Sequence, residues 1–247
     1  MKLWLLAVLF IIPGISFAEA NTATLRKTVL VGAYGFAPYY DLEKGRGIVT
    51  EVLEQLNSMQ ADFHFKVVEI PSSRRYQSFT DGKVDMIFFE DPRWEWKDIP
   101  HYTIPVGIQD AEVYIALKKK AKDQSYFNSL TGKRIAGIVG YHYGFAKFNA
   151  DEAYLQSKFK ISLVSHNLAS VRLVLHERAD VAVVPLSFIR RYLRENPEKN
   201  AEVLISEKVD QHYDLRLIVN PKASIPRERL ENLMSKLVKE PSYQALF

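Results

Sequence analysis

The chain has 247 residues and no cysteine, with 47% hydrophobic residues, 25% charged residues and a formal net charge of +4. This composition is ordinary for a folded protein, so it excludes a mainly disordered chain, disulfides, a cysteine-linked lipid anchor and a thiolate nucleophile. The length suits one large domain or two lobes of roughly 100 residues each. Basic residues are spread along the chain, and the one dense run, Lys118 to Lys120 with Lys122, follows a predicted strand. We expect a solvated edge there and no nucleic-acid binding.

The first 20 residues have the pattern of a secretory signal peptide. Lys2 precedes an apolar run from Leu3 to Phe17, and small residues follow that run. The run is too short and too broken for a membrane span. We predict cleavage after Ala18 or Ala20 and export of the remaining chain to the periplasm.

The exported chain begins with a strand, an aromatic loop and a helix. Val29–Val31 is a short apolar run, and apolar residues recur at helical spacing over 48–59. The loop between them contains Tyr34, Phe36 and Tyr39. In open α/β sheets ligands bind outside the carboxyl ends of the strands. We therefore expect these rings to line a ligand site, with packing in a buried core as the alternative.

The rest of the chain alternates between strands and helices. Apolar runs, alternation and turn residues predict strands at 63–67, 84–89, 113–117, 133–139, 161–164, 180–184, 204–205 and 213–219, and helices at 72–79, 167–176, 187–194 and 226–238. This order indicates an α/β fold with mixed, mostly parallel sheets flanked by helices.

Two extended segments, near 105–111 and 205–211, look like crossings between two α/β units, and the last strand and helix have no partners in the second unit. We therefore predict two lobes joined by two hinge strands around a cleft. The first lobe is 21–106 with 210–247, and the second is 107–209.

Several segments of the chain resemble the bacterial extracellular solute-binding proteins of family 3. They are Phe36–Tyr40 followed by Gly47–Ile48, then Asp81–Met86, Leu130–Ala136, Gly140–Tyr141, Glu177–Ala182 and Tyr213–Asn220. Their order and spacing cover nearly the whole mature chain. The resemblance implies a type II periplasmic-binding fold that closes on one small molecule and delivers it to an inner-membrane ABC permease. We accordingly expect a monomeric binding protein that is not an enzyme and has no cofactor or metal.

The resemblance also implies ligand-binding residues, and this chain departs from the family at two places. Arg93 matches the arginine that holds a ligand carboxylate, but Glu90 and Asp91 stand where hydroxyl residues are expected. Those carboxylates could hold Arg93 themselves or face a cationic ligand, and Arg93 could also form a mere surface salt bridge. Pro185 stands where the family has its amine-binding aspartate, which argues against an ordinary α-amino acid as the ligand.

Further site candidates come from both lobes. Arg74 and Arg75 lie in the first turn of a predicted helix, where a positive charge opposes the helix dipole. We expect Arg74 to face the ligand, with a solvated pair as the alternative. Tyr141, His142 and Tyr143 follow a strand of the second lobe. The predicted function is closure of two aromatic walls over a small polar solute that is anionic or amino-acid-like.

Two other functions stay open. The histidines show no metal-binding spacing, and no nucleophile elbow or phosphate loop is present. Dehydratases related to these binders share the fold, and Glu90 would then be the acid or base. A ligand-sensing partner of a membrane receptor is the other alternative, with Trp94, Trp96 and the lysine run as its contact surface.

Overall fold

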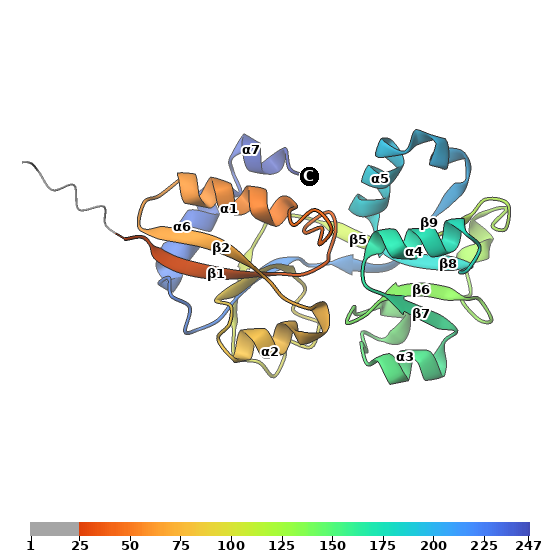
Figure 1. Ribbon diagram of the computed structural model, residues 1–247, viewed down its shortest axis with the longest axis horizontal. Coiled ribbons are helices and arrows are strands. Elements are labelled where there is room, and N and C mark those ends of the chain that lie inside the picture. Colours follow the sequence, from red (N-terminus) through yellow and green to blue (C-terminus); the bar gives the residue numbers. More distant parts are fainter. Residues whose placement is uncertain (1–24) are drawn as a thin grey trace, which may run out of the picture.

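The computed structural model describes residues 25–247 and contains two α/β lobes side by side (Figure 1). The predicted signal peptide lies outside the described residues. Each lobe is built on a five-stranded sheet, with strand order β2-β1-β3-β10-β4 in the first and β7-β6-β8-β5-β9 in the second. The predicted two-lobed α/β fold is confirmed. Each sheet is parallel on one half and antiparallel on the other, so both sheets are more evenly mixed than predicted.

The first sheet has helices on both faces. Its strands are β1 (Lys27–Ala33), β2 (Phe63–Glu69), β3 (Met86–Glu90), β4 (Tyr102–Pro105) and β10 (Arg216–Val219). Its helices are α1 (Ile48–Ser58), α2 (Arg75–Thr80), α6 (Arg227–Leu237) and α7 (Pro241–Gln244). Helix α1 lies above the sheet and α2 below it (Figure 1). The buried face of α1 carries apolar residues at helical spacing, which is why this stretch packs as a helix.

The second sheet has the same arrangement. Its strands are β5 (Asp110–Leu117), β6 (Ile135–Ile138), β7 (Ile161–Val164), β8 (Val181–Pro185) and β9 (Val203–Tyr213). Its helices are α3 (Glu152–Lys158), α4 (Asn167–Leu175) and α5 (Leu186–Glu195). Asp151 caps α3, because its carboxylate accepts a hydrogen bond from the backbone N–H of Tyr154 at 2.7 Å.

Short 3₁₀ helices fill several of the connections. They are Ser72–Arg74, Gln124–Phe127, Gly144–Ala146 and Pro197–Ala201. Ser72–Arg74 runs directly into α2, and Gly144–Ala146 follows the loop after β6. Ser72–Arg74 lies at the contact between the lobes, because Ser72 Oγ donates to the carbonyl of Val139, whereas Gly144 and Phe145 donate their backbone N–H groups to Asp210 within the second lobe.

Partly buried aspartates connect distant segments in each lobe. Asp85, just before β3, accepts hydrogen bonds from the backbone N–H groups of Leu30 at 2.7 Å and Ser224 at 2.8 Å. In the second lobe Asp180 accepts from the guanidinium and the backbone N–H of Arg134. These hydrogen bonds lower the pKa of Asp180, so the carboxylate stays charged and holds the turn before β8.

The hinge strands differ from the prediction. Only 204–205 and 213–219 were predicted as strands in this region, but β9 continues to Tyr213 and pairs with β5, whereas β10 begins at Arg216 in the other sheet. Polar residues interrupt the apolar pattern in the middle of β9, which hides the strand from a sequence reading. The second crossing between the sheets therefore falls at residues 214–215, and the proposed lobe boundary at 209/210 lies inside β9.

Candidate functional site

A small cavity lies where the two lobes meet. Its volume is about 10 Å³, enough for roughly one water molecule. Four residues of its wall belong to the first lobe and six to the second: Tyr34, Phe36, Arg75 and Trp94, then Glu112, Gly140, Tyr141, His142, Gln211 and Tyr213. The first lobe contributes its loop after β1, the start of α2 and the loop after β3. The second contributes the loop after β6 and the two hinge strands.

Arg75 is the centre of the first-lobe wall. Its side chain is 2% exposed and pairs with the buried carboxylate of Glu90 at the end of β3. A guanidinium has five N–H donors, and all five of Arg75 are used. The acceptors are Glu90 at 3.3 Å, the carbonyls of Ser72 at 2.6 Å and Gly140 at 2.9 Å, the hydroxyl of Tyr76 at 2.7 Å, and Nδ1 of His142 at 3.0 Å.

Glu90 has a complete set of donors. Its carboxylate accepts hydrogen bonds from the Tyr34 hydroxyl, from Trp96 Nε1 at 2.7 Å and from Arg75. Burial raises the pKa of Glu90, and these three partners oppose that shift. Because Arg75 keeps its charge and all of the donors point at the carboxylate, the pair is ionised and its charges cancel.

Direct contacts hold the lobes closed. Arg75 donates to the carbonyl of Gly140, and the Tyr141 hydroxyl donates to the carbonyl of Gly35 at 2.6 Å. Ser72 Oγ donates to the Val139 carbonyl at 2.8 Å. Each of these bonds joins one lobe to the other, so the small cavity exists only while the lobes touch.

His142 is buried in this contact as a neutral ring. Its Nδ1 accepts from Arg75, and its Nε2 lies 3.4 Å from the hydroxyl of Tyr76 and 3.5 Å from the exposed carboxylate of Glu95. Burial, together with the positive charge of Arg75, lowers the pKa of His142 to about 2. At neutral pH the ring therefore contributes polarity and stacking surface to the wall, and no positive charge.

Glu112 of β5 is the second buried carboxylate, and its surroundings are sparse. One oxygen, Oε2, accepts from Gln211 Nε2 at 2.7 Å, while Oε1 is buried and has no hydrogen-bond partner. Burial and the carboxylate of Asp210 raise the pKa of Glu112 well above its usual value. Gln211 and Tyr213 lower that pKa, but their effect is smaller.

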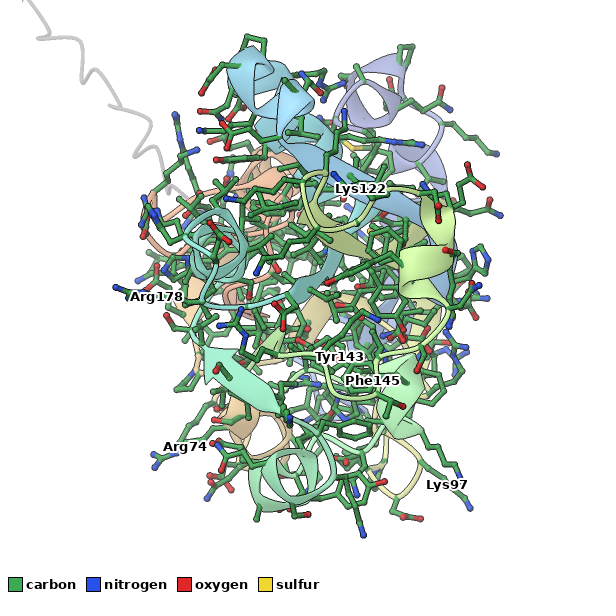
Figure 2. All side chains as sticks on the ribbon, turned by 90° about the vertical axis from the view of Figure 1, so that its right-hand side faces the viewer. Arg74, Lys97, Lys122, Tyr143, Phe145 and Arg178 are labelled. Atoms are coloured by element: carbon green, nitrogen blue, oxygen red, sulfur yellow. The ribbon has the colours of Figure 1, made fainter. Side chains whose placement is uncertain are left out.

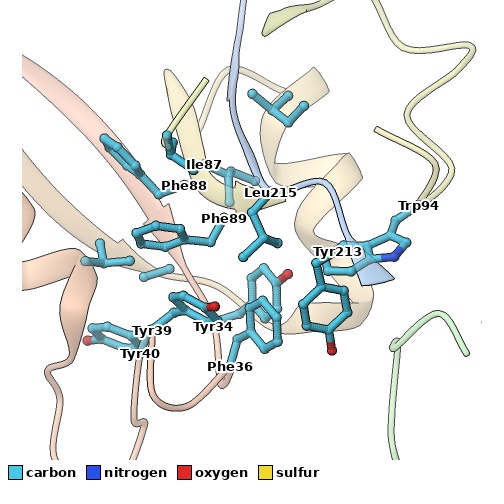
Figure 3. Close-up of a cluster of buried hydrophobic side chains, with 14 of the residues drawn as sticks. Tyr34, Phe36, Tyr39, Tyr40, Ile87, Phe88, Phe89, Trp94, Tyr213 and Leu215 are labelled. Carbon is cyan, nitrogen blue, oxygen red and sulfur yellow. The ribbon is translucent and has the colours of Figure 1, made fainter. Parts of the chain in front are cut away.

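Aromatic rings form much of the cavity wall, and Figure 3 shows Phe36, Trp94 and Tyr213 among the buried rings of this region. The ring of Phe36 is central, with centroids 5.6 Å from Tyr141, 5.8 Å from Tyr213 and 5.9 Å from Trp94, each in an edge-to-face arrangement. The Trp94 and Tyr213 rings are 5.3 Å apart. Trp94 Nε1 also donates to Gln211 Oε1 at 3.1 Å. The rings thus come from both lobes and pack as one cluster.

The structure brings some of the predicted site residues together and separates others. Tyr34, Phe36, Tyr141 and His142 line the cavity, and Glu90 lies behind its wall. Their role in ligand binding remains a proposal, treated below.

Arg74 lies elsewhere and needs a correction. It was expected to face the ligand, but its side chain is exposed and extends from the outside of the molecule (Figure 2). The 3₁₀ turn Ser72–Arg74 before α2 turns Arg75 inward instead, toward Glu90. The guanidinium in the cavity wall therefore belongs to the next residue.

Arg93 does not line the cavity. Its guanidinium is about half exposed, donates to both oxygens of Asp91 at 2.9 and 2.6 Å, and also donates to the carbonyl of His212. Asp91 in turn accepts from the backbone N–H of Asp214 at 2.9 Å. These bonds fasten the end of β3 to the crossing between β9 and β10. This matches the alternative in which a neighbouring carboxylate holds Arg93.

Tyr39 and Tyr143 also lie outside the cavity wall. The Tyr39 hydroxyl donates to Asp110 at 2.8 Å across the lobes, and its ring borders a separate groove of about 410 Å³ beside α5. The Tyr143 hydroxyl accepts from the backbone N–H of Ile138 at 2.6 Å, inside the second lobe. Neither ring belongs to the wall of the small cavity, and a role of either in ligand binding stays a prediction.

The sequence analysis did not name Glu112, Gln211 and Tyr213 of the cavity wall, preferred Arg74 where Arg75 lines the cavity, and left Trp94 between surface and ligand contact. A signal for Glu112 existed, because it is one charged residue at the start of the apolar run 113–117 in a predicted hinge segment. Pro185, which carries no charge, pairs in register with Glu112 on the neighbouring strand. A carboxylate is therefore present next to Pro185, the position at which the resemblance implies an amine-binding aspartate and this chain has none.

Two kinds of feature are absent from the described residues, a candidate metal cluster and a candidate membrane span. In the range 25–247 no group of three or more His, Asp or Glu residues could hold a metal ion. Likewise, no helix in the described part of the chain is long and apolar enough to cross a membrane.

Comparison with known proteins shows the fold. No model of a protein family matches the chain, and no curated protein matches it. Among solved structures it is similar to an ArgBP mutant from T. maritima, with 18% identity, TM-score 0.66 and coverage of 89% of this chain and 93% of that one. It is also similar to ArtJ, the arginine-, lysine-, histidine-binding protein from Geobacillus stearothermophilus, with 14% identity, TM-score 0.68, and coverage of 90% and 93%.

A third similar structure is AncCDT-1, an ancestral amino-acid-binding protein and precursor of cyclohexadienyl dehydratase. Its identity is 17%, its TM-score is 0.65, and 89% of this chain is covered. The aligned region also covers 93% of the AncCDT-1 chain. At these identities the likeness establishes a fold shared with amino-acid-binding proteins, and the chemistry of the site has to be argued from this chain's own residues.

Proposed function

We propose that this chain is a periplasmic solute-binding protein whose lobes close over one small polar solute and present it to an ABC-type importer. The observation that carries the proposal is the interlobe cavity: charged, polar and aromatic side chains from both lobes meet there around an enclosed space. Binding sites of this kind combine apolar walls with a few placed polar groups.

Closure also gives a physical reason for a binding role. The bonds from Arg75 to Gly140 and from Tyr141 to Gly35 form only when the lobes touch. A solute that contacts both walls favours the closed form by the difference between its affinities for the two forms. The importer can then recognise that form as the loaded state. We propose that the protein acts as a monomer, because the site is complete within one chain.

The charge of the site bears on the solute. The sequence led us to expect an anionic group, but Arg75 already has Glu90 as a partner and uses every one of its donors. His142 is neutral at neutral pH because its pKa is lowered to about 2. The cavity wall, within the described residues, therefore offers no unpaired positive charge to a carboxylate.

A thermal-shift screen of the exported chain against amino acids, amines, organic acids and sugars tests this proposal. We expect at least one compound to raise the melting temperature with concentration, as ligand binding to the folded state requires. Small-angle scattering with that compound should show a compact monomer. A library without any stabilising compound would refute the solute-binding role. Conversion of the bound compound, followed by NMR, would instead indicate an enzyme.

A further inference from the structure

The oxygen Oε1 of Glu112 is a fully buried side-chain atom of the cavity wall that has no hydrogen-bond partner among the described residues. The Glu112 residue is 1% exposed, and Oε1 is buried without any donor in hydrogen-bond geometry, whereas Oε2 is held by Gln211. A buried polar atom without a partner costs free energy of about 1–3 kcal/mol, more if charged, so its retention in a cavity wall needs an explanation. A ligand that donates to Oε1 supplies one.

Two polar neighbours in the wall, Gln211 and Arg75, already have hydrogen-bond partners for their donors. The amide of Gln211 donates to Glu112 and to the carbonyl of His142, and it accepts from Trp94. Arg75 has all five N–H groups in use. A carboxylate could bind Arg75 only by breaking bonds that hold the lobes together, whereas a donor could reach Oε1 without breaking any.

The aromatic part of the wall favours the same kind of ligand. Phe36, Trp94 and Tyr213 form a cluster with centroid separations of 5.3–5.9 Å, and all three line the cavity together with Glu112. Aromatic faces attract cations, and the attraction grows when the cation is removed from water. A carboxylate surrounded by rings is therefore a site for an organic cation.

The size of the cavity limits the cation. A space of about 10 Å³ accepts a group of roughly the volume of one water, so only a small head fits while the lobes are fully closed. A larger head would hold the lobes slightly apart and lose the direct interlobe bonds.

We propose that the solute is a small ammonium-type cation without a carboxylate, with its head held by Glu112 Oε1 against the rings of Phe36, Trp94 and Tyr213. This inference rests on the proposed solute-binding function and goes further, because it names the class of solute and the residue that selects it. Glu112 is then the specificity-determining residue, and Arg75 with Glu90 is the scaffold that positions the wall.

Proton release gives an independent signature. Burial and the Asp210 carboxylate raise the pKa of Glu112, so a bound cation would favour its ionised form and release a proton to solvent. Cation affinity should then rise with pH. The titratable and charged groups around Glu112 are Asp110 and Tyr114 of β5, Asp210 and Tyr213 of β9, Tyr141, His142 and Tyr143 after β6, and Arg75 from the first lobe.

Calorimetry with ammonium, methylammonium and tetramethylammonium chlorides tests the inference, with sodium chloride at equal ionic strength as the reference. We expect at least one ammonium salt to bind the wild-type chain, and Glu112→Gln to weaken that binding at least tenfold. Glu207→Gln is the matched control, because Glu207 is an exposed residue of β9 outside the cavity, and it should bind like the wild type. If Glu112→Gln does not fold, the wild type alone tests the inference. Calorimetry in two buffers of different ionisation enthalpy then measures whether cation binding releases a proton.

The outcomes separate the two proposals. If an amino acid, a sugar or another carboxylate binds and closes the lobes while Glu112→Gln keeps full affinity, the cation inference is wrong and the solute-binding role stands. If ammonium salts act no differently from sodium chloride, or bind without proton release and independently of Glu112, the inference is also wrong. If no solute of any class binds, both proposals fail.

Discussion

Two buried glutamates lie on opposite sides of the interlobe cavity, one in each lobe. Glu90 of the first lobe accepts hydrogen bonds from Tyr34, Trp96 and Arg75 and forms an ion pair. Glu112 of the second lobe accepts from Gln211 through one oxygen and leaves the other without a partner. Both are fully buried carboxylates, so burial alone does not distinguish a structural group from a binding group.

The difference lies in how completely each carboxylate is satisfied. A fully bonded buried ion pair fixes the shape of its surroundings, and breaking it leaves an uncompensated charge. A carboxylate oxygen without a donor keeps its capacity to bind a further group. Glu90 of the first lobe therefore has donors for its carboxylate within the protein, whereas Glu112 of the second lobe keeps one oxygen without a partner. The following experiments test that contrast.

The largest effect is expected when the charge of Glu90 is removed, and the same substitution at Glu112 provides the comparison. Glu90→Gln leaves Arg75 buried without a counter-charge and should lower the free energy of unfolding by about 3–5 kcal/mol. Glu112→Gln keeps an acceptor for Gln211 and removes a buried carboxyl, so it should change that free energy by less than about 1 kcal/mol. Urea unfolding of both variants measures the difference. Equal losses for the two variants would show that both carboxylates are structural.

Acid should destabilise the contact through His142, because its pKa is lowered to about 2 in the folded protein. The unfolded ring binds a proton near its usual pKa of about 6.5, so between these values the unfolded state binds more protons and stability falls as pH falls. From about pH 7 to about pH 5 this one group should remove about 2 kcal/mol from the free energy of unfolding.

A variant isolates this contribution. Burial raises the pKa values of Glu90 and Glu112, which acts in the opposite direction as pH falls. The charged and titratable groups that face His142 are Arg75, Tyr76 and Glu95. His142→Gln keeps an acceptor for Arg75 and has no titration of its own, so its stability relative to the wild type should improve steadily as pH falls. If the difference in free energy of unfolding between His142→Gln and the wild type did not change with pH, His142 would not be a neutral buried ring.

Lobe contact at Gly140 should produce an intermediate effect. Gly140 has φ of +75°, and an added Cβ would lie 2.8 Å from the backbone nitrogen of Ser73 in the other lobe. Gly140→Ala should therefore favour separated lobes, increase the radius of gyration in small-angle scattering and weaken solute binding about tenfold, which corresponds to about 1.4 kcal/mol.

Gly132 supplies a matched control for that substitution. Its φ is +78°, but no atom lies within 4 Å of the position of an added Cβ. Gly132→Ala thus carries the same backbone strain of about 1 kcal/mol without a contact between lobes. If both alanine variants changed lobe separation equally, the close approach of Gly140 to Ser73 would not be what limits closure.

Much of the fold could be predicted from the sequence because local patterns determine it. Apolar runs bounded by turn residues marked most of the strands, and helical spacing marked α1, α4, α5 and α6. The long hinge strand β9 was missed because its middle is polar, and β4 and α3 were missed as well. These elements are defined by pairing and packing with distant segments, which a local pattern does not contain.

The site divides in the same way. The aromatic residues Tyr34, Phe36 and Tyr141 were predictable because ligand sites lie at strand-to-helix junctions. Glu112 was harder to place, because a charged residue beside an apolar run normally faces solvent, whereas here β5 lies between β8 and β9 and the side chain is buried. Choosing between adjacent arginines was equally beyond a local pattern, since a 3₁₀ turn before α2 decides which of them points inward.

The smallest effect is expected at Arg74, and Arg75 beside it provides the contrast. Arg74→Ala removes an exposed guanidinium and should change the free energy of unfolding by less than about 0.5 kcal/mol without affecting solute binding. Arg75→Lys keeps the positive charge but has three N–H donors for the five hydrogen bonds that Arg75 makes. It should therefore lower the free energy of unfolding and weaken the contact between the lobes. Urea unfolding and calorimetry on both variants measure this. Weaker solute binding by Arg74→Ala would mean that Arg74 reaches the solute before the lobes close, and the first-lobe wall would then have a binding role beyond its scaffold.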